Sequence, residues 1–465
     1  MATNIIWVAK NGRAGALGTE SSPLASIQEA INKATPGTTI MVKGGVYTEN
    51  VKFSKGGTAS APITLVSADG PSKAEIKPAS GSADTIRVQA PANYITIDGF
   101  KVYGPSSKDS VHITSSDNMT KISTGITIQN MEILATSGDG IKVSQGDHIK
   151  ILNNKVSGST SEQGIDLVGA THSVISGNDV SGIATMAAIQ VKGGSYDIEI
   201  SYNNVHNTGK WGFLVGGVTS PSSLLPGTTD YEVKDVRMFG NEVDGSAAQA
   251  VRVMGGTNVK ISGNWFHDVG SSRFIDVLAA ADQHAAWVSK NVTFENNSFD
   301  RTSWLTVESG NPQPIQSGNI TSGVAPAGWA DNSGIAPSTP TPAPIPSTPT
   351  TTTPSTPLPT ETTKLPMARD DKASTSVGTA VKIDILANDD AIAWANAKIT
   401  NPLYGTLKSG GNDTIVYTPK TGFKGVDTFK YTLTDADGHQ STATVTVDVG
   451  GTTITKTSWA DYFLL

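Results

Sequence analysis

The hexapeptide GDGIKV at residues 138–143 recurs in altered form along the middle of the chain. Its relatives are EQGIDL (162–167), AAIQVK (187–192), WGFLVG (211–216), QAVRVM (249–254), RFIDVL (273–278) and SWLTVE (303–308). Most of them follow the previous one by about 23 to 26 residues, and an insertion near 218–232 widens one interval. After each comes a second short apolar stretch with an Asn turn, such as ILNNKV at 151–156. A β repeat with a period in the twenties predicts a solenoid of the parallel β-helix type.

Alternate side chains of a strand point to opposite faces, so the apolar residues that flank the centre of each hexapeptide are expected to face the core. These pairs are Ile141/Val143, Ile165/Leu167, Ile189/Val191, Phe213/Val215, Val251/Val253, Ile275/Val277 and Leu305/Val307. The residue between them then faces outward, and stacking predicts an outward column of Lys142, Asp166, Gln190, Leu214, Arg252, Asp276 and Thr306. The Asn turns predict a second column, whose amides bond from coil to coil: Asn154, Asn178, Asn203, Asn241, Asn264 and Asn297.

The composition limits both the partners and the chemistry of the chain. It has 465 residues and a formal net charge of −7 without a basic cluster, which argues against nucleic acid as a partner. Because Cys is absent, disulfides, zinc–thiolate sites and thiol nucleophiles are excluded. No apolar run reaches the ~18 residues of a membrane-spanning helix, so no membrane insertion is expected. The N-terminus MATNIIWVAKNG lacks a basic segment followed by an apolar one, so we expect no cleaved signal peptide.

The chain is predicted to have four segments. Residues 1–315 form the β-helix domain, residues 316–365 an extended Pro/Thr-rich linker, residues 366–450 a small Ig-like β-sandwich and residues 451–465 a tail. A short helix capped by Ser26 is expected to cover the N-terminal end of the solenoid, with an apolar face of Ile27, Ala30, Ile31 and Ala34. The predicted fold class is all-β: a right-handed parallel β-helix with a capping helix and a C-terminal sandwich. We expect a monomer.

Two stretches near the C-terminus resemble known modules. The motifs ARDDKASTSVGTAVKIDILAND (368–389) and YTPKTGFKGVDTFKYTLTDADG (417–438) resemble the cadherin-like or Ig-like repeat of large secreted bacterial proteins. That resemblance implies a spacer or adhesion module. The terminal WADYFLL (459–465) resembles the uncleaved C-terminal signal of type I secretion substrates. Together these resemblances imply a bacterial protein that is secreted by type I export.

The outward residues of three successive coils bring several polar groups together. Asp166 should lie between Lys142 and Gln190, since strand pairing spaces the coils by roughly 4.8 Å. Lys192 faces out two residues beyond Gln190, which places it roughly 8 Å from Asp166. This arrangement suggests a surface patch with both acidic and basic groups.

Three carboxylates at this patch suggest a hard-cation site. Asp139 and Glu162 flank Asp166 on the turn side, and Ca²⁺ with these oxygen ligands is the predicted metal. Two simpler interpretations stay open. Lys142 and Asp166 can form a cross-strand ion pair, and Asp139 can be an ordinary turn residue.

The stretch beginning WVAKNG (7–12) resembles the entry region of secreted β-helix enzymes that act on acidic polysaccharides. The acidic patch resembles family 9 pectate lyases, which use a calcium site built from Asp residues and a Lys base on adjacent coils. By motif, Asp139 in GDG and Glu162 and Asp166 in SEQGID match the acidic cluster, and Lys192 in QVKGG matches the catalytic lysine. Gln163 stands where the family pattern has an acid. The resemblance implies that the cation acidifies the C5 proton of a bound uronate, that Lys removes it, and that the glycosidic oxygen leaves by β-elimination.

Other residues along the outward column are assigned to the substrate. Arg252 can grip a uronate carboxylate, and we assign it to catalysis with Lys192. No Ser–His–Asp order stands out in the sequence. Substrate contacts are assigned to Lys142, Gln190, Trp211 and Arg273.

The leading hypothesis is a secreted lyase that cleaves a uronate-containing glycan such as pectate or alginate. A non-catalytic glycan-binding adhesin is the main alternative, which the Ig-like module favours equally. A β-helix glycoside hydrolase would need paired acids, and Asp166 and Asp276 stand four coils apart in the column. A uronan C5-epimerase is the last alternative, although the Asp-Pro-His-Glu motif of that family is absent.

Overall fold

The computed structural model describes residues 4–323 except 116–120, 159–160, 271–273 and 281–286, together with residue 325 and residues 371–450 except 386–397, 401, 403, 412–413 and 435–439. The chain divides into two compact units, Met1–Pro342 and Ala343–Leu465. The predicted tail 451–465 and most of the predicted linker 316–365 lie outside the described residues. No helix in the described part is long and apolar enough to cross a bilayer.

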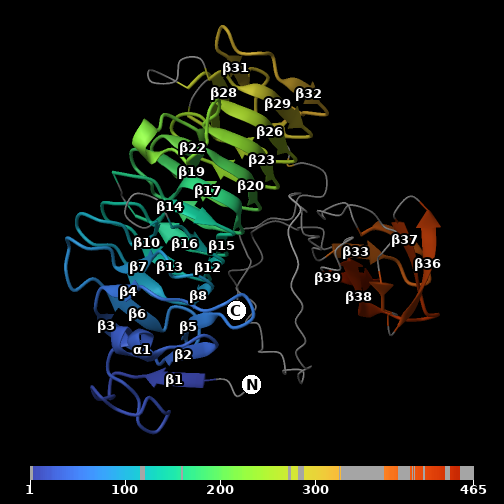
Figure 1. The fold of residues 1–465 in the computed structure, drawn as a ribbon. Coiled ribbons are helices and arrows are strands. Elements are labelled where there is room, and N and C mark those ends of the chain that lie inside the picture. Colours follow the sequence, from blue (N-terminus) through green and yellow to red (C-terminus); the bar gives the residue numbers. More distant parts are fainter. Residues whose placement is uncertain are drawn as a thin grey trace, which may run out of the picture. The chain divides into compact units, whose positions relative to one another are not determined.

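The first unit is a parallel β-helix with three faces (Figure 1). One ladder, called here the first ladder, carries the hexapeptides recognised in the sequence. Its strands stack in the order β4 (Val51–Phe53), β7 (Ile86–Gln89), β10 (Val111–Thr114), β14 (Ile141–Asp147), β17 (Ile165–Ser176), β19 (Ala187–Lys192), β22 (Trp211–Gly216), β25 (Val251–Met254), β28 (Ile275–Leu278) and β31 (Leu305–Val307).

Two further parallel ladders complete each coil. The second consists of β1 (Asn4–Val8), β2 (Thr38–Val42), β5 (Ile63–Ser67), β8 (Ile95–Asp98), β12 (Ile126–Gln129), β15 (Lys150–Leu152), the second half of β17, β20 (Ser195–Ser201), β23 (Val233–Phe239), β26 (Gly256–Ser262), β29 (Lys290–Glu295) and β32 (Ile315–Ser317), with β11 (Ser123–Thr124) paired to the end of β14. The third consists of β3 (Gly45–Thr48), β6 (Ala74–Lys77), β9 (Lys101–Tyr103), β13 (Glu132–Leu134), β16 (Lys155–Ser157), β18 (Asp179–Ser181), β21 (Asn204–His206), β24 (Glu242–Asp244), β27 (Trp265–His267) and β30 (Ser298–Phe299).

The predicted inward pairs form the core. From Ile141/Val143 to Ile275/Val277 every member is at most 1% exposed. The last pair, Leu305 and Val307, is only half-buried. These residues lie on β31, the last strand of the first ladder in the described part of the chain. Each coil therefore buries two or more branched apolar side chains, and this burial drives the stacking.

The predicted Asn column is a continuous buried ladder. Asn154 donates both its backbone N–H (3.0 Å) and its Nδ2 (2.9 Å) to Oδ1 of Asn178, and Nδ2 also donates to the Ile128 carbonyl at 3.0 Å. The same pattern repeats through the other predicted members and continues to Asn319, which the sequence prediction missed. Each buried amide is thus satisfied by its neighbours in adjacent coils.

The predicted helix is α1 (Ile27–Lys33), and it closes the N-terminal end of the solenoid. Ser26 is its N-cap, with Oγ accepting from the Glu29 N–H at 3.2 Å. Its apolar face packs into the core against β1, β2 and β4. The Glu49 carboxylate accepts from the backbone N–H groups of Ile27 (2.8 Å) and Gln28 (3.0 Å), which satisfies two donors of the first turn.

The second unit is a small β-sandwich. One sheet contains β33 (Asp371–Thr375), β35 (Lys398–Ile399), β38 (Gly425–Thr434) and β39 (Gln440–Val449), and the other contains β34 (Val381–Asp384), β36 (Gly405–Gly411) and β37 (Thr414–Pro419). Tyr417, Tyr431 and Val445 lie fully buried in its core. The predicted Ig-like fold is therefore confirmed for this unit.

Candidate functional site

Strand register confirms the predicted outward column. Lys142 pairs with Asp166, Asp166 with Gln190, and Gln190 with Leu214. The column then runs through Arg252 to Asp276 and Thr306. It also extends in the other direction, through His112 and Arg87 to Lys52. Successive coils thus present a row of mostly charged side chains on the first ladder.

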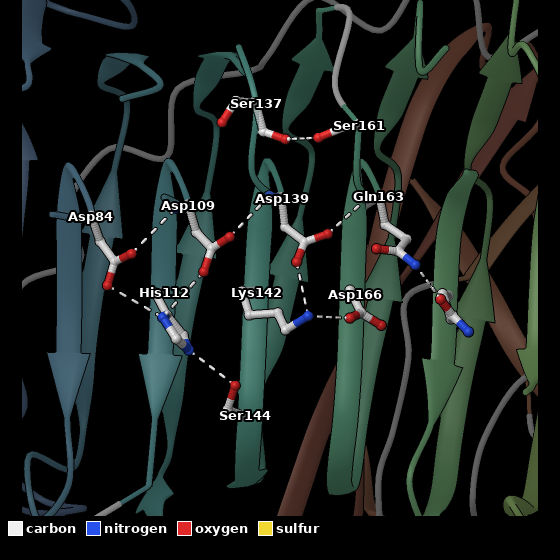
Figure 2. Close-up of polar contacts among 11 residues, drawn as sticks. Asp84, Asp109, His112, Ser137, Asp139, Lys142, Ser144, Ser161, Gln163 and Asp166 are labelled. Atoms are coloured by element: carbon white, nitrogen blue, oxygen red, sulfur yellow. Dashed lines mark hydrogen bonds and ion pairs between the residues drawn. The ribbon is translucent and has the colours of Figure 1, made fainter. Parts of the chain in front are cut away.

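A second row, which we call the aspartate ladder, runs beside the outward column at the turns that precede the strands. Asp109 N–H donates to Asp84 Oδ1 at 3.2 Å, Asp139 N–H to Asp109 Oδ1 at 2.9 Å, and Gln163 N–H to Asp139 Oδ1 at 2.8 Å (Figure 2). Each member stands two residues before the first inward residue of its strand, in DTI, DSV, DGI and QGI. That recurring spacing could have revealed Asp84 and Asp109 in the sequence, where only Asp139 was singled out.

The Lys142 ammonium is held by two buried carboxylates. Its Nζ donates to Asp139 Oδ2 at 2.8 Å and also forms a short ion pair with Asp166 Oδ2 (Figure 2). The side chains of Asp139 and Asp166 are 2% and 0% exposed. Burial and, next, the charge of Asp166 raise the pKa of Asp139 to about 7. Burial opposes ionisation of Lys142, but the two carboxylates outweigh it and raise its pKa, so this lysine keeps its proton.

The cross-strand ion pair between Lys142 and Asp166 is therefore present, together with a third partner, Asp139. Asp166 Oδ1 is buried and accepts no hydrogen bond from any side chain or backbone group in the described part of the chain. One ammonium faces two carboxyl groups, so the group is neutral only when one of them is protonated, which agrees with the raised pKa of Asp139.

Calcium does not fit the predicted ligands in this arrangement. The Lys142 ammonium occupies the space between Asp139 and Asp166, where a cation would have to lie. With its amide rotated by 180°, the side-chain nitrogen of Gln163 donates to Asp139 Oδ1 (2.9 Å) and to Glu162 Oε2 (3.2 Å). Glu162 itself is exposed. The ammonium and N–H donors already contact both oxygens of Asp139 and Oδ2 of Asp166, whereas Asp166 Oδ1 has no hydrogen bond in the described part of the chain. A calcium site at these residues stays a prediction.

The structure assembles a contact network around His112 that sequence order did not reveal. His112 Nδ1 lies 3.2 Å from Asp84 Oδ2 and 3.2 Å from Asp109 Oδ2, and its Nε2 lies 3.0 Å from Ser144 Oγ (Figure 2). The four residues come from three successive coils, with up to 60 positions between them in the chain. No Ser–His–Asp order stands out in the sequence, but the stacking of the coils brings Ser144, His112 and Asp84 into contact.

Lys192 lies at the end of β19, in register with Val168. It is partly exposed, and no hydrogen bond or ion pair joins its ammonium to another residue that the structure describes. Gln190 is different, since it is 3% exposed, its Nε2 donates to the Gly216 carbonyl at 3.3 Å, and its amide contacts that of Gln163. Lys192 is therefore open to a ligand, whereas Gln190 is engaged within the protein.

The insertion after β22 borders Lys192. It contains a 3-10 turn at Pro221–Ser223, and Leu225 N–H donates to the Gly193 carbonyl at 2.9 Å. The buried Glu232 carboxylate accepts from the Thr219 N–H at 3.0 Å, from Thr219 Oγ1 at 2.7 Å and from the Gly193 N–H at 3.1 Å. These bonds fix the two ends of the insertion against the turn that follows Lys192.

Arg252 and Trp211 form a cluster of their own, two coils beyond Gln190. Arg252 Nη2 donates to Asp276 Oδ2 at 3.1 Å, and its guanidinium carbon lies 4.6 Å from the centre of the Trp211 ring. Lys210 Nζ lies 4.0 Å from the same ring, and Trp211 Nε1 donates to Gln249. The Trp211 ring, which was assigned to substrate contact, thus already contacts two cationic side chains. Arg273, the remaining predicted contact, lies outside the described residues.

Comparisons with known proteins agree with this architecture. Residues 6–161 match the family model for the Pel9A-like right-handed β-helix region, and residues 363–448 match the bacterial Ig domain. Pectate lyase PEL9 of Emericella nidulans is 46% identical over 69 residues, which make up 14% of this chain. The matched part spans only 17% of the length of that protein. The β-helix family match ends before Glu162, Asp166 and Lys192.

Solved structures with similar folds are more distant in sequence. Pectate lyase Pel9A is 14% identical with a TM-score of 0.45, covering 70% of this chain and 82% of that one. The A-module of the mannuronan C-5 epimerase AlgE4 of Azotobacter vinelandii is 16% identical with a TM-score of 0.49, covering 68% and 95%. Residues 6–161 are therefore similar to the Pel9A-like right-handed β-helix region, and residues 363–448 are similar to the bacterial Ig domain.

Proposed function

We propose that the β-helix binds an acidic, uronate-containing polysaccharide along the outward column and cleaves it by β-elimination, with Lys192 as the base. The observation that carries this proposal is the contrast between two outward lysines that lie two strands apart in the first ladder, on β14 and β19. Two carboxylates keep the Lys142 ammonium protonated. By contrast, no hydrogen bond or ion pair joins the Lys192 ammonium to another described residue. A base must be able to lose its proton, so only Lys192 is suited to that role.

The proposed chemistry uses one group of this chain and solvent water. Lys192 takes the C5 proton of the bound uronate, the electrons of the C5–H bond form a C4–C5 double bond, and the bond from C4 to the glycosidic oxygen breaks. The departing oxygen takes a proton from water. The negative charge that builds on the uronate during proton removal needs a positive neighbour. Lys142 and Arg252 lie on either side of Lys192 in the stack, and both carry partly exposed charged groups. The local identity to pectate lyase PEL9 supports this substrate class.

The family match and the bacterial Ig domain also support an extracellular setting. We propose secretion from a bacterial cell, with type I export as the route. Expression of the full chain with and without residues 451–465 in a host that carries a type I exporter tests this point. Loss of the secreted protein on truncation is expected, and equal secretion of both forms contradicts this route.

The lyase assignment is tested with the full chain and a panel of pectate, alginate and related uronans. Ultraviolet absorbance of the new C4–C5 double bond is the expected readout. Lys192→Ala should lower the rate ~100-fold or more, as expected for loss of a general base. Lys150→Ala, an exposed lysine on the second ladder, is the matched control and should leave the rate unchanged. Glycan binding without unsaturated product across the panel would favour the adhesin alternative and reject the lyase.

A further inference from the structure

The network around His112 has the contacts of a nucleophilic triad. A hydroxyl lies within hydrogen-bond distance of one imidazole nitrogen, at 3.0 Å from Ser144 Oγ to His112 Nε2. The other imidazole nitrogen faces two carboxylates, Asp84 and Asp109, at 3.2 Å each. A nucleophile bonded to a base that is itself oriented by a carboxylate is the arrangement that activates serine for acyl transfer, on whatever fold it occurs.

The carboxylates determine which imidazole nitrogen carries the proton. Both Asp oxygens that face Nδ1 are acceptors, so Nδ1 must be the N–H and the lone pair of neutral His112 is left at Nε2, toward Ser144. Burial works against ionisation of Asp84, but the hydrogen bond from His112, with the charge of Arg87 in addition, holds the pKa of its carboxyl below the ordinary value. Asp84 therefore remains a charged acceptor that fixes the ring.

Exposure to solvent increases across the network from Asp84 to His112 and Ser144, as acyl transfer requires. The Asp84 side chain is 3% exposed, His112 is 15% exposed, and Ser144 is partly exposed on the outer face of β14. The orienting carboxylate is thus shielded, while the base and the nucleophile can be reached from outside. Ser144 lies in register between Thr114 and Val168, which leaves small or apolar neighbours beside its hydroxyl.

Positive charge flanks the network on both sides. Arg87 pairs in register with His112 on the preceding coil, and Lys142 on the following coil. Lys142 and Ser144 share the outer face of β14, about 7 Å apart along the strand. The exposed Arg87 guanidinium can attract a negatively charged glycan there, whereas the Lys142 ammonium is already held by Asp139 and Asp166.

We propose that Ser144 and His112, positioned by Asp84 and Asp109, form a second catalytic centre that hydrolyses O-acyl esters carried by a polysaccharide. Ser144 Oγ attacks the ester carbonyl carbon while its proton passes to His112 Nε2. The tetrahedral intermediate collapses, the C–O bond to the sugar breaks, and the sugar oxygen takes the proton from Nε2. Water, deprotonated by His112, then attacks the acyl-Ser144 bond and releases the carboxylic acid and free Ser144. This centre does not use Lys192, so the proposal can be tested independently of the proposed lyase activity.

The first test is covalent labelling of the full chain with a fluorophosphonate, which traps activated serines. Mass spectrometry of the digested protein should place the adduct on Ser144. Labelling should be lost in Ser144→Ala, should slow ~100-fold in His112→Ala, and should persist in Ser181→Ala, a partly exposed strand serine on the third ladder. Wild-type protein without an adduct on Ser144 after prolonged exposure overturns the proposal, and this result needs no variant to fold.

Two further readouts separate catalysis from a structural network. The full chain should release acetate from O-acetylated pectin, and Lys150→Ala, an exposed lysine on the second ladder, should release it at the wild-type rate. The groups that face His112 are Asp84 and Arg87 from the preceding coil, Asp109, and Ser144 and Lys142 from the following coil. Asp109→Asn removes one negative charge, so the midpoint of labelling rate against pH should move to lower pH. An unchanged midpoint rejects the positioning role.

Discussion

Lys142 Nζ lies 2.8 Å from Asp139 Oδ2, and the two side chains come from the same coil, three residues apart. The same ammonium reaches Asp166 on the next coil, so one lysine joins two turns of the solenoid through buried carboxylates. The resemblance to family 9 lyases predicted a metal ion at this point. In the structure, the ammonium group of Lys142 lies at that position.

Replacing Lys142 by Ala should destabilise the β-helix. Asp139 and Asp166 would stay buried without their counter-charge, which typically costs about 3–5 kcal/mol. Thermal unfolding of the full chain measures the change. Lys150→Ala, on an exposed site of the second ladder, should shift the unfolding free energy by less than about 0.5 kcal/mol. Equal stability of the two variants would show that the ion pairs contribute nothing.

Chelation should leave the wild-type protein unchanged. Because the Lys142 ammonium already lies between the two carboxylates, EDTA and added Ca²⁺ should alter neither the melting temperature nor the rate of uronan cleavage. In Lys142→Ala the same two carboxylates lack a cation, so millimolar Ca²⁺ should raise the melting temperature by mass action. A melting temperature of the wild type that rises with Ca²⁺ and falls with EDTA would restore the calcium site predicted from sequence.

The raised pKa of Asp139 predicts a pH dependence of stability. Its ordinary value of 3.8 rises to about 7 in the fold, so the folded state binds this proton more tightly than the unfolded state. The associated stability is complete below about pH 4 and is lost as pH rises toward 7. The melting temperature of the wild type, minus that of Asp139→Asn, should therefore fall across that window. Asp230→Asn, an exposed carboxylate, should give a flat difference.

A break in the Asn ladder should be costly although it removes few atoms. Asn203→Ala removes the side-chain partner of the buried Asn178 N–H and of the buried Ile175 carbonyl. The Nδ2 of Asn178 loses one acceptor and keeps the Ile151 carbonyl. Unsatisfied buried groups cost about 1–3 kcal/mol each when relaxation is limited. Asn32→Ala, on the exposed side of α1, is the control and should change the melting temperature little. Comparable losses in both variants would contradict a special role for the ladder.

Arg252→Lys should weaken substrate binding more than it weakens folding. Lysine keeps the charge but loses the planar group that packs on Trp211 and the fork that reaches Asp276. We expect KM for uronan cleavage to rise several-fold with a smaller change in kcat. Arg237→Lys, which alters an Arg that pairs with Asp197 on the second ladder, should leave KM unchanged. An unchanged KM would contradict a contact between Arg252 and the bound uronate.

The repeat allowed the outward column, the inward pairs and the Asn ladder to be predicted residue by residue. Each prediction follows from strand alternation and a nearly constant coil length, which are local properties. Asn319 and the aspartate ladder were missed because their coils lack a strong hexapeptide, although DTI and DSV keep the spacing of DGI. The roles assigned to Gln190 and Trp211 depended on whether their side chains remain accessible to a ligand. Contacts with residues of other coils decide this, and a local sequence pattern does not reveal them.

The sequence by itself determined the architecture, because the period and the alternation dictate which side chains are buried and which columns form. Only the tertiary structure decided how the charges in those columns pair. Lys142 could have faced solvent or a substrate, and it turned to Asp139 and Asp166 because burial makes an unpaired carboxylate costly. Likewise Asp84, His112 and Ser144 come from three different coils, so contact between them depends on the register in which those coils stack.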